Sequence, residues 1–423
     1  MGISLLLAGR MRDAAPLELL ATAAGWFANA CADALESTGI DEGGAGHPRL
    51  LLRLHPAAEP AALVAAGGGR LVFAAQTAAA GPGYHRYVCD AVRRFGDEFG
   101  VEWAPSDGAE GFGDPSGYFD GGDPGEVDRV MLDWLGAAAA RARERADAGE
   151  RGLSLSLSQS VDFSGDFAIA TPLGPRDRVW LDVTAADPTQ GADVFPWWED
   201  GLTAEVRIRR ALCRLWTDVR WRAPLRDEER AVLRAVTDDL GHAFREAPQR
   251  DFPWREWREL LAWMGASGTL AEEVVRRANG TDAAAPLVGY RRGDVRVRLE
   301  GGWSIRVPGA LAEAVERDGT WHAFDHRRRV RFRVLGSGDD DAVPDAETLL
   351  GSGTTAAGAL AHEVGAVRSR ASIARDERGE ELTALCAAPG SVAICTVSFD
   401  GDDDRHWALE TWRSVERAAL TGN

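Results

Sequence analysis

The sequence predicts an α+β protein of more than one domain: a mixed α/β N-terminal part, a helical, Trp-rich middle, and a C-terminal antiparallel sheet with flanking helices. Three observations carry this prediction. Short apolar runs alternate with helical patterns through the first third of the 423 residues. Helical periodicity with frequent tryptophan dominates from Gly174 to Arg277. After residue 287, apolar and polar residues alternate between turn signals, as in strands with one buried face.

Two or three domains are expected for this length. We place a mixed α/β domain at 1–173, a helical segment at 174–278 and an α+β domain at 287–423; the first two are compatible with one unit. The stretch 279–286, Asn-Gly-Thr-Asp-Ala-Ala-Ala-Pro, is rich in turn residues and is the best linker candidate.

The elements of the first domain follow from apolar runs and helix signals. Asp123-Pro124-Gly125-Glu126 places Asp at a helix cap, Pro at the first helical position and Glu at the third, so a capping box is expected to start a helix that runs to about Gly149. Strands are expected at 3–8, 50–54, 71–75, 153–157 and 167–170, and helices at 16–36 and 84–99.

In the middle segment, helices are predicted at 202–216, 228–244, 254–264 and 270–278. The pattern F-P-W-x-E occurs twice, at 195–199 and at 252–256. Pro at these positions suits a helix start, with the aromatic residues packing against the first turn. An internal duplication would explain why the motif occurs twice, but a single match of five residues is more simply explained by chance.

The C-terminal domain has the clearest strand signals. Residues 294–300 and 303–307 flank Gly301-Gly302, which predicts a hairpin. A short helix is expected near 310–316, and a last helix is expected to begin at Asp402-Asp403-Asp404. Further strands are expected at 321–324, 328–335, 369–374, 381–387 and 392–399.

The chain contains no lysine, and all 48 basic residues are arginine. This excludes the P-loop lysine, the ATP lysine of protein kinases, the Schiff-base lysine of pyridoxal enzymes and the lysine of Ser-Lys hydrolases. A GC-rich coding bias is the simpler explanation, and selection against lysine modification is the alternative. Every cationic contact is therefore made by a planar guanidinium, which suits carboxylates, phosphates and aromatic faces.

The net charge of −18 is unevenly distributed. Residues 101–200 carry 20 acidic residues against 7 arginines, residues 201–333 carry 20 against 26, and residues 334–423 carry 16 against 7. The basic centre predicts either complementarity between domains or a local anion-binding surface.

The chain is expected to lie in the reducing cytoplasm of a bacterium. Five scattered cysteines form no disulfide or zinc-ribbon pattern. The first residues lack the basic region of a signal peptide, and no apolar stretch reaches the ~18 residues of a membrane span. No membrane association is therefore expected.

The most concrete candidate for binding is an arginine face. Apolar residues and arginine alternate in 295–299 and again in 329–334, so one face of each strand carries the arginines. If the two strands are neighbours, the arginines share one surface for an acidic partner, phosphate or nucleic acid. A solvated face paired with acidic residues of the same chain is the favoured alternative. The five arginines are Arg296, Arg298, Arg329, Arg331 and Arg333.

Two weaker candidates concern catalysis. His322, Asp325 and His326 lie within five residues, although no HExxH pattern accompanies them and metal binding is not favoured. His85 and Cys89 are four residues apart on a predicted helix, which is compatible with a Cys-His nucleophile pair but more typical of core packing. The glycine-rich stretch 111–117 matches neither a dinucleotide fingerprint nor an EF-hand.

The leading hypothesis is a non-catalytic protein-binding component, of adaptor, chaperone-like or immunity type, because catalytic motifs are absent and Trp and Arg, which are enriched at binding hot spots, are abundant. The expected partner is another protein. An enzyme with a dispersed His/Asp or Cys/His site is the alternative, as is phosphate or nucleic-acid binding, which the acidic overall charge disfavours. No cofactor and no metal are expected, and the oligomeric state is left open.

Overall fold

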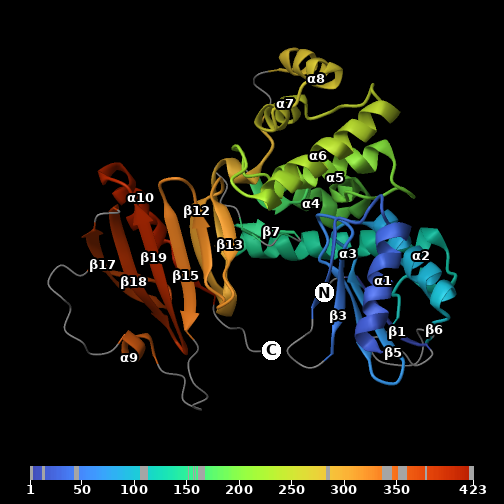
Figure 1. The fold of residues 1–423 in the computed structure, drawn as a ribbon, viewed down its shortest axis with the longest axis horizontal. Helices are drawn as coiled ribbons and strands as arrows, with labels where there is room; N and C mark the ends of the chain where they lie inside the picture. The colour runs from blue at the N-terminus through green and yellow to red at the C-terminus, as the bar shows by residue number, and fades with distance from the viewer. Residues whose placement is uncertain are drawn as a thin grey trace. The chain divides into compact units, whose positions relative to one another are not determined.

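The computed structural model of the chain (Figure 1) describes residues 3–11, 15–41, 47–104, 113–150, 152–155, 157, 159–160, 167–282, 286–335, 345–350, 360–376 and 379–418. Its contacts define two compact units. Unit 1 comprises residues 1–157, 163–219 and 231–289; unit 2 comprises residues 158–162, 220–230 and 290–423. The α+β class is confirmed. The domain boundaries expected from the sequence stay predictions, and residues 283–285 of the linker candidate lie outside the described residues.

Unit 1 is built on a six-stranded antiparallel sheet with the order β2-β3-β4-β5-β1-β6. The strands are β1 (Ser4–Arg10), β2 (Ser37–Asp41), β3 (Arg49–Arg53), β4 (Ala61–Ala66), β5 (Arg70–Gln76) and β6 (Glu102–Trp103). Sequence patterns predicted β1, β3 and β5 but missed the short β2 and the alanine-rich β4.

Two helices, α1 (Pro16–Ala30) and α2 (Pro82–Phe99), cover one face of this sheet (Figure 1). Side chains of a strand alternate between the two faces, so Leu5 and Leu7 enter the core while Leu6 stays half-buried. The rings of Phe27 on α1 and Phe95 on α2 stack with their centroids 5.3 Å apart, which joins the two helices. This layer buries one whole side of α2.

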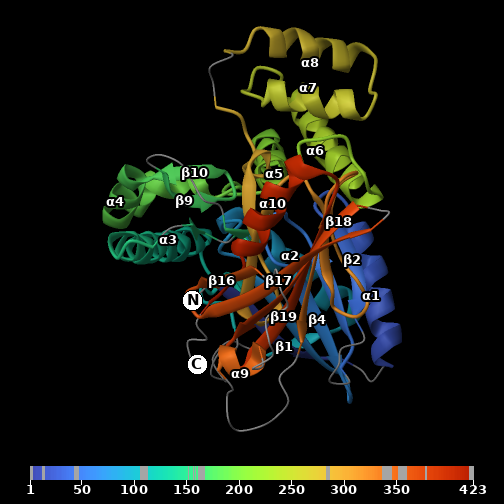
Figure 2. The same ribbon diagram turned by 90° about the vertical axis from the view of Figure 1, so that its left-hand side faces the viewer.

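The next part of unit 1 packs α3 (Pro124–Asp147) beside α4 (Arg178–Ala186), as Figure 2 shows. Asp123 caps α3 by accepting the N–H of Gly125, as predicted. The reciprocal half of the capping box is absent, because Glu126 accepts from Arg129 Nε at 2.9 Å instead. A three-stranded sheet accompanies the helices: β7 (Leu153–Ser154), β9 (Phe167–Thr171) and β10 (Gly174–Asp177).

The four predicted helices of the middle segment are present as α5 (Ala204–Thr217), α6 (Asp227–Glu246), α7 (Trp254–Trp263) and α8 (Thr269–Asn279). The two F-P-W-x-E copies differ in structure. Pro253 stands at the start of α7 as predicted, whereas Pro196 starts no helix and Trp197 enters the core of unit 1. Because the copies occupy unlike environments, the structure does not support a duplication.

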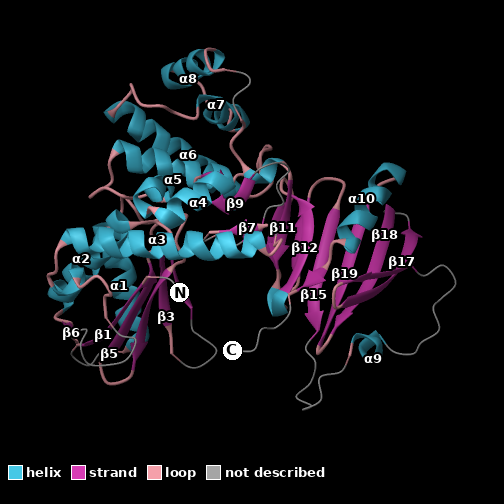
Figure 3. Ribbon diagram, turned by 180° about the vertical axis from the view of Figure 1, so that it is seen from behind, coloured by secondary structure: helices cyan, strands magenta, loops and turns pink. Residues whose placement is uncertain are grey.

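Unit 2 packs two antiparallel sheets and α10 (Asp402–Arg413) around one core (Figure 3). The smaller sheet has the order β20-β12-β11-β8 and the larger β13-β14-β15-β19-β18-β17-β16. The smaller sheet consists of β8 (Gln159–Ser160), β11 (Asp294–Arg298), β12 (Trp303–Pro308) and β20 (Glu416–Arg417). The larger consists of β13 (Ala312–Val315), β14 (Trp321–Phe324), β15 (Arg329–Leu335), β16 (Leu360–Val364), β17 (Val367–Asp376), β18 (Gly379–Ala388) and β19 (Ser391–Phe399).

The prediction of a short helix near 310–316 is wrong. Its Ala, Leu and Glu content favours a helix, but residues 312–315 form β13 and pair with β14 in the register Ala312↔Phe324 to Val315↔Trp321. Cross-strand pairing in a sheet overrides a weak local propensity. The hairpin at Gly301-Gly302 is confirmed by the β11–β12 register. A short helix, α9 (Ala346–Leu350), was not predicted.

Candidate functional site

The predicted single face of five arginines is wrong. Arg296 and Arg298 lie on β11, whereas Arg329, Arg331 and Arg333 lie on β15, and the two strands belong to different sheets. Val295 of β11 and Phe332 of β15 enter the same core. The apolar faces of the two sheets are therefore turned toward each other, and the two sets of arginines point away from the core on opposite sides.

The arginines of β11 are only partly available. Arg296 is half-buried, donates to the carbonyl of Ser414 at 3.0 Å and pairs with Glu416 at 3.1 Å. It ties β11 to the end of the chain that follows α10. Arg298 is exposed at the end of the strand. Arg296 thus fits the alternative expected from the sequence, in which an arginine of the face pairs with an acidic residue of the same chain.

The three arginines of β15 form a separate set, which we call the β15 arginine row. All three are exposed on the outer face of the seven-stranded sheet, while Val330 and Phe332 between them are buried. Arg333 pairs with Asp318 at 3.0 Å. Among the described residues, Arg329 and Arg331 have no ion-pair partner. The row therefore presents cationic groups that the described chain leaves largely uncompensated.

The His322, Asp325 and His326 candidate is not assembled. His322 lies on the outer face of β14, with Nδ1 3.8 Å from Glu316. Asp325 caps the following turn by accepting the N–H groups of Arg327 and Arg328, at 2.9 and 2.8 Å, and it also pairs with the Arg328 guanidinium. His326 is exposed in that turn. The three side chains thus serve different local structures.

His85 and Cys89, the other candidate, lie together in the core of unit 1. Both are fully buried on α2, where residues four apart share a face. A loop that sequence templates did not identify brings Asp114 and Ser116 to the same place. His85 Nε2 lies 3.1 Å from Asp114 Oδ1, 3.2 Å from Ser116 Oγ and 3.5 Å from Cys89 Sγ. We call His85, Cys89 and Asp114 the His85 cluster.

Asp114 organises the loop around it. It accepts hydrogen bonds from the backbone N–H groups of Ser116 and Phe119, at 2.9 and 2.8 Å, and from the Ser116 hydroxyl. Burial alone would raise its pKa, but His85 and these N–H groups outweigh burial and lower the pKa of Asp114 to about 2. The carboxylate is therefore ionised inside the protein.

The geometry of the His85 cluster does not suit a nucleophilic cysteine. In a relay, the thiol and the orienting carboxylate contact opposite nitrogens of the imidazole, whereas Cys89 and Asp114 both contact Nε2 here. Burial also raises the pKa of the Cys89 thiol, which is opposite to what activation requires. His85, Cys89 and Asp114 are all buried, so a substrate has no access.

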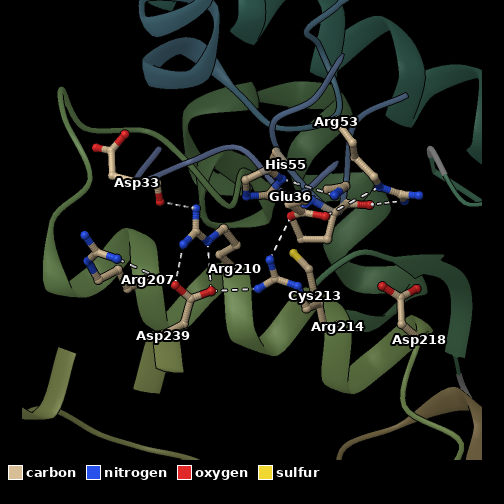
Figure 4. A network of polar contacts seen from close by, with 12 residues as sticks. Asp33, Glu36, Arg53, His55, Arg207, Arg210, Cys213, Arg214, Asp218 and Asp239 are labelled. Carbon is tan, nitrogen blue, oxygen red and sulfur yellow. Dashed lines mark hydrogen bonds and ion pairs between the residues drawn. The ribbon is translucent and has the colours of Figure 1, made fainter. Parts of the chain in front are cut away.

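A second polar cluster in unit 1, buried except for Arg53, has no signal in the sequence (Figure 4). Asp239 of α6 accepts one hydrogen bond from Arg210 Nε at 2.8 Å and another from Arg214 at 2.6 Å. Both arginines lie on α5. Arg214 also donates to Glu36 at 2.8 Å, and Glu36 lies 3.5 Å from Arg53 Nε. We call this set the Asp239 network. It joins α5 and α6 to the residues around β2 and β3.

His55 lies beside the Asp239 network and is completely buried. Burial lowers its pKa well below 6.5, and the positive charges of Arg210, Arg214 and Arg53 lower the pKa further. Its Nδ1 accepts the N–H of Ala57 at 3.1 Å, so the neutral ring carries its proton on Nε2. The network is therefore a charged interior feature beside a neutral histidine, and its role is to hold elements together.

All five cysteines are free and buried. None of the helices in the described residues is both long enough and apolar enough to span a membrane.

No family model matches the chain, and no curated protein does. Among solved structures, a crystal structure from Bacteroides thetaiotaomicron VPI-5482 is similar over 31% of this chain and 50% of its own length, with 13% sequence identity and a TM-score of 0.24. The chain thus spans half of that protein, and a likeness this low transfers neither fold nor function.

Proposed function

We propose that the protein is a non-catalytic protein-binding component, of adaptor, chaperone-like or immunity type, of a bacterial cytoplasmic system, and that the β15 arginine row binds an extended acidic segment of its partner. One observation carries the proposal. Three exposed arginines stand at alternate positions of one internal strand, and two of them have no ion-pair partner among the described residues.

The neighbours of the row support the same conclusion. Across from Arg329 and Arg331, β19 places the uncharged Ser398 and Thr396, and β14 places Phe324 and His322. Burial lowers the pKa of His322, and the nearby arginines lower it further against the opposite effect of Glu316. His322 is therefore neutral at pH 7, and no carboxylate stands directly opposite the two arginines.

The spacing of the row suggests the form of the ligand. Side chains at alternate strand positions are about 6.6–6.8 Å apart. An extended segment with carboxylates at every second residue has the same repeat. Guanidinium groups bind carboxylates in a bidentate manner, so the match favours such a segment over a single small anion. Because the row lies on an internal strand, the segment would bind through side chains and not by strand addition.

Two other functions are less favoured. Phosphates of a nucleic acid could also contact the row, but a net charge of −18 repels a polyanion at long range. An enzyme is disfavoured because the His322 candidate is not assembled and the buried Cys89 is not activated. Protein recognition needs neither of these features.

The test uses a fluorescent peptide that carries glutamate at alternate positions. Its binding to the full chain is measured by fluorescence anisotropy. We expect replacement of Arg329, Arg331 and Arg333 by Gln to weaken binding about 10–100-fold, since each exposed charge pair contributes up to about 1 kcal/mol. Rising salt should weaken binding to the wild-type protein.

The matched control replaces the exposed Arg94, Arg141 and Arg234 by Gln, which removes the same total charge at scattered places. This variant should bind like the wild type. Equal losses in both variants would mean that net charge alone governs binding and would overturn the proposed site. Tighter binding of duplex DNA or of inorganic phosphate than of the peptide would favour the anion-binding alternative.

A further inference from the structure

The His85 cluster places three side chains of metal-ligand type around one ring nitrogen of His85. The Thr77 hydroxyl donates to the carbonyl of Ile3 at 3.3 Å, so its oxygen accepts from His85 Nδ1 at 2.9 Å. In the neutral ring, Nε2 then carries a lone pair. This nitrogen faces Asp114 Oδ1 at 3.1 Å. A cation bound to one of the two atoms would therefore lie within reach of the other.

The other groups around Nε2 add electron pairs. The Ser116 hydroxyl gives its hydrogen to Asp114, at 2.8 Å, and so presents an oxygen lone pair to Nε2. Cys89 Sγ completes the set, and the Nε2, Sγ and carboxylate atoms all lie within 4.8 Å of one another. An imidazole, a thiol and a carboxylate are three typical ligands of Zn²⁺.

The distances match those around a tetrahedral ion. With metal–nitrogen and metal–oxygen bonds of about 2.0–2.1 Å and a metal–sulfur bond of about 2.3 Å, the ligands are separated by about 3.3 Å for N···O and about 3.5 Å for N···S. The corresponding separations here are 3.1 and 3.5 Å. The third separation, between Cys89 Sγ and the Asp114 carboxylate, is within 4.8 Å.

We propose that His85, Cys89 and Asp114 form a buried structural site for a divalent cation of the zinc class. His85 binds through Nε2, while Thr77 accepts from Nδ1 and orients the ring, as second partners of metal-bound histidines do. The Cys89 thiol gives up its proton to solvent when the sulfur–metal bond forms. The ion would join α2 to the loop 113–119, which Gly113 ties to Leu6 of β1.

The full-length protein tests this proposal through its metal content and through cobalt. We expect protein expressed in zinc-supplemented medium to hold about one equivalent of zinc. After denaturation with a chelator and refolding with one equivalent of Co²⁺, we expect a thiolate-to-cobalt charge-transfer band. The Cys89→Ala and Asp114→Asn variants should lose the band or bind at least 100-fold more weakly, and Thr77→Val should bind about 10–100-fold more weakly.

Cys31→Ala is the matched control, because it removes an equally buried thiol elsewhere in unit 1. This variant should bind metal like the wild type. If the variants of the cluster do not fold, the wild-type protein decides alone. Wild-type protein that contains no metal as expressed and shows no cobalt–thiolate band would overturn the proposal. Retention of full binding by Cys89→Ala would overturn it as well.

Discussion

At the residue scale, Asp239 is the carboxylate that compensates two buried arginines of unit 1. It is the shared partner of Arg210 and Arg214, and all three are nearly inaccessible. Removing one member of a buried ionic set leaves the others without compensation in a medium that stabilises charge poorly. The network therefore makes unit 1 sensitive to the loss of this one carboxylate.

We expect Asp239→Asn to lower the free energy of unfolding by about 3–5 kcal/mol, measured by urea denaturation. Asp133→Asn is the control, since Asp133 is exposed and only adds a second partner to Arg129. The control should unfold like the wild type. An Asp239→Asn protein as stable as the control would show that the network contributes little.

His55 predicts a pH dependence of stability. Its pKa is lowered in the folded state, so below about pH 6.5 the unfolded chain binds a proton that the folded chain refuses. This contribution to stability is present above pH 6.5 and is lost as the pH falls. Relative to His55→Gln, the wild type should therefore lose up to about 1.4 kcal/mol per pH unit more between pH 6.5 and 5. Parallel stability curves for the two proteins would contradict this assignment.

At the element scale, α2 begins in close contact with the segment that carries the first F-P-W-x-E copy. A Cβ on Gly83 would lie 2.1 Å from the carbonyl oxygen of Glu199 and 2.7 Å from the Trp197 ring. Only glycine allows this approach. The same segment donates from Trp197 N to the carbonyl of Ala80 at 2.8 Å, which locks the start of the helix that carries His85 and Cys89.

Gly83→Ala should therefore destabilise the protein by about 1–3 kcal/mol in thermal or urea unfolding, because the overlap involves backbone that must move. Gly25→Ala in α1 is the matched control, since nothing lies within 4 Å of the added methyl group. There the higher helix propensity of alanine should stabilise by about 0.5–1 kcal/mol. Equal effects of the two changes would refute the close contact.

Also at this scale, the sequence predicted most elements but not how they meet. Period-2 alternation correctly placed Arg329, Arg331 and Arg333 on one face of a strand. It contains no information on which sheet a strand joins, so the link to Arg296 and Arg298 was wrong. His85 and Cys89 were found because their spacing is local, whereas Asp114 reaches them from a loop 29 residues after His85 in the chain. Long-range pairing of this kind has no local signal.

At the scale of the whole molecule, unit 2 is not one continuous piece of chain. Its small sheet includes β8, from residues 159–160. Its residues 220–230 also contact the C-terminal part of the unit: Arg220 pairs with Glu313 at 2.5 Å, and Arg222 donates to the carbonyl of Ala310 at 2.6 Å. Glu313 also pairs with Arg291 at 2.9 Å. A cut at the linker candidate therefore removes parts of unit 2.

We expect residues 287–423 expressed alone to be markedly less stable than unit 2 in the full chain. The half-buried Glu313 would lose one of its two arginines, and β11 would gain a free edge. Hydrogen exchange of β15 and β19 in the fragment and in the full chain measures this directly. Equal protection in both would show that the predicted boundary separates two independent domains.

A property of the whole molecule is that it contains no lysine, so its basic side chains bind through arginine guanidinium groups of fixed geometry. We propose that the spacing of the β15 arginine row, and not charge alone, selects the ligand. The decisive measurement compares the dissociation constants of two peptides of identical composition, one with glutamate at every second position and one with the glutamates in a single block. We expect the alternating peptide to bind the wild-type protein about tenfold more tightly, and equal constants would rule out selection by spacing.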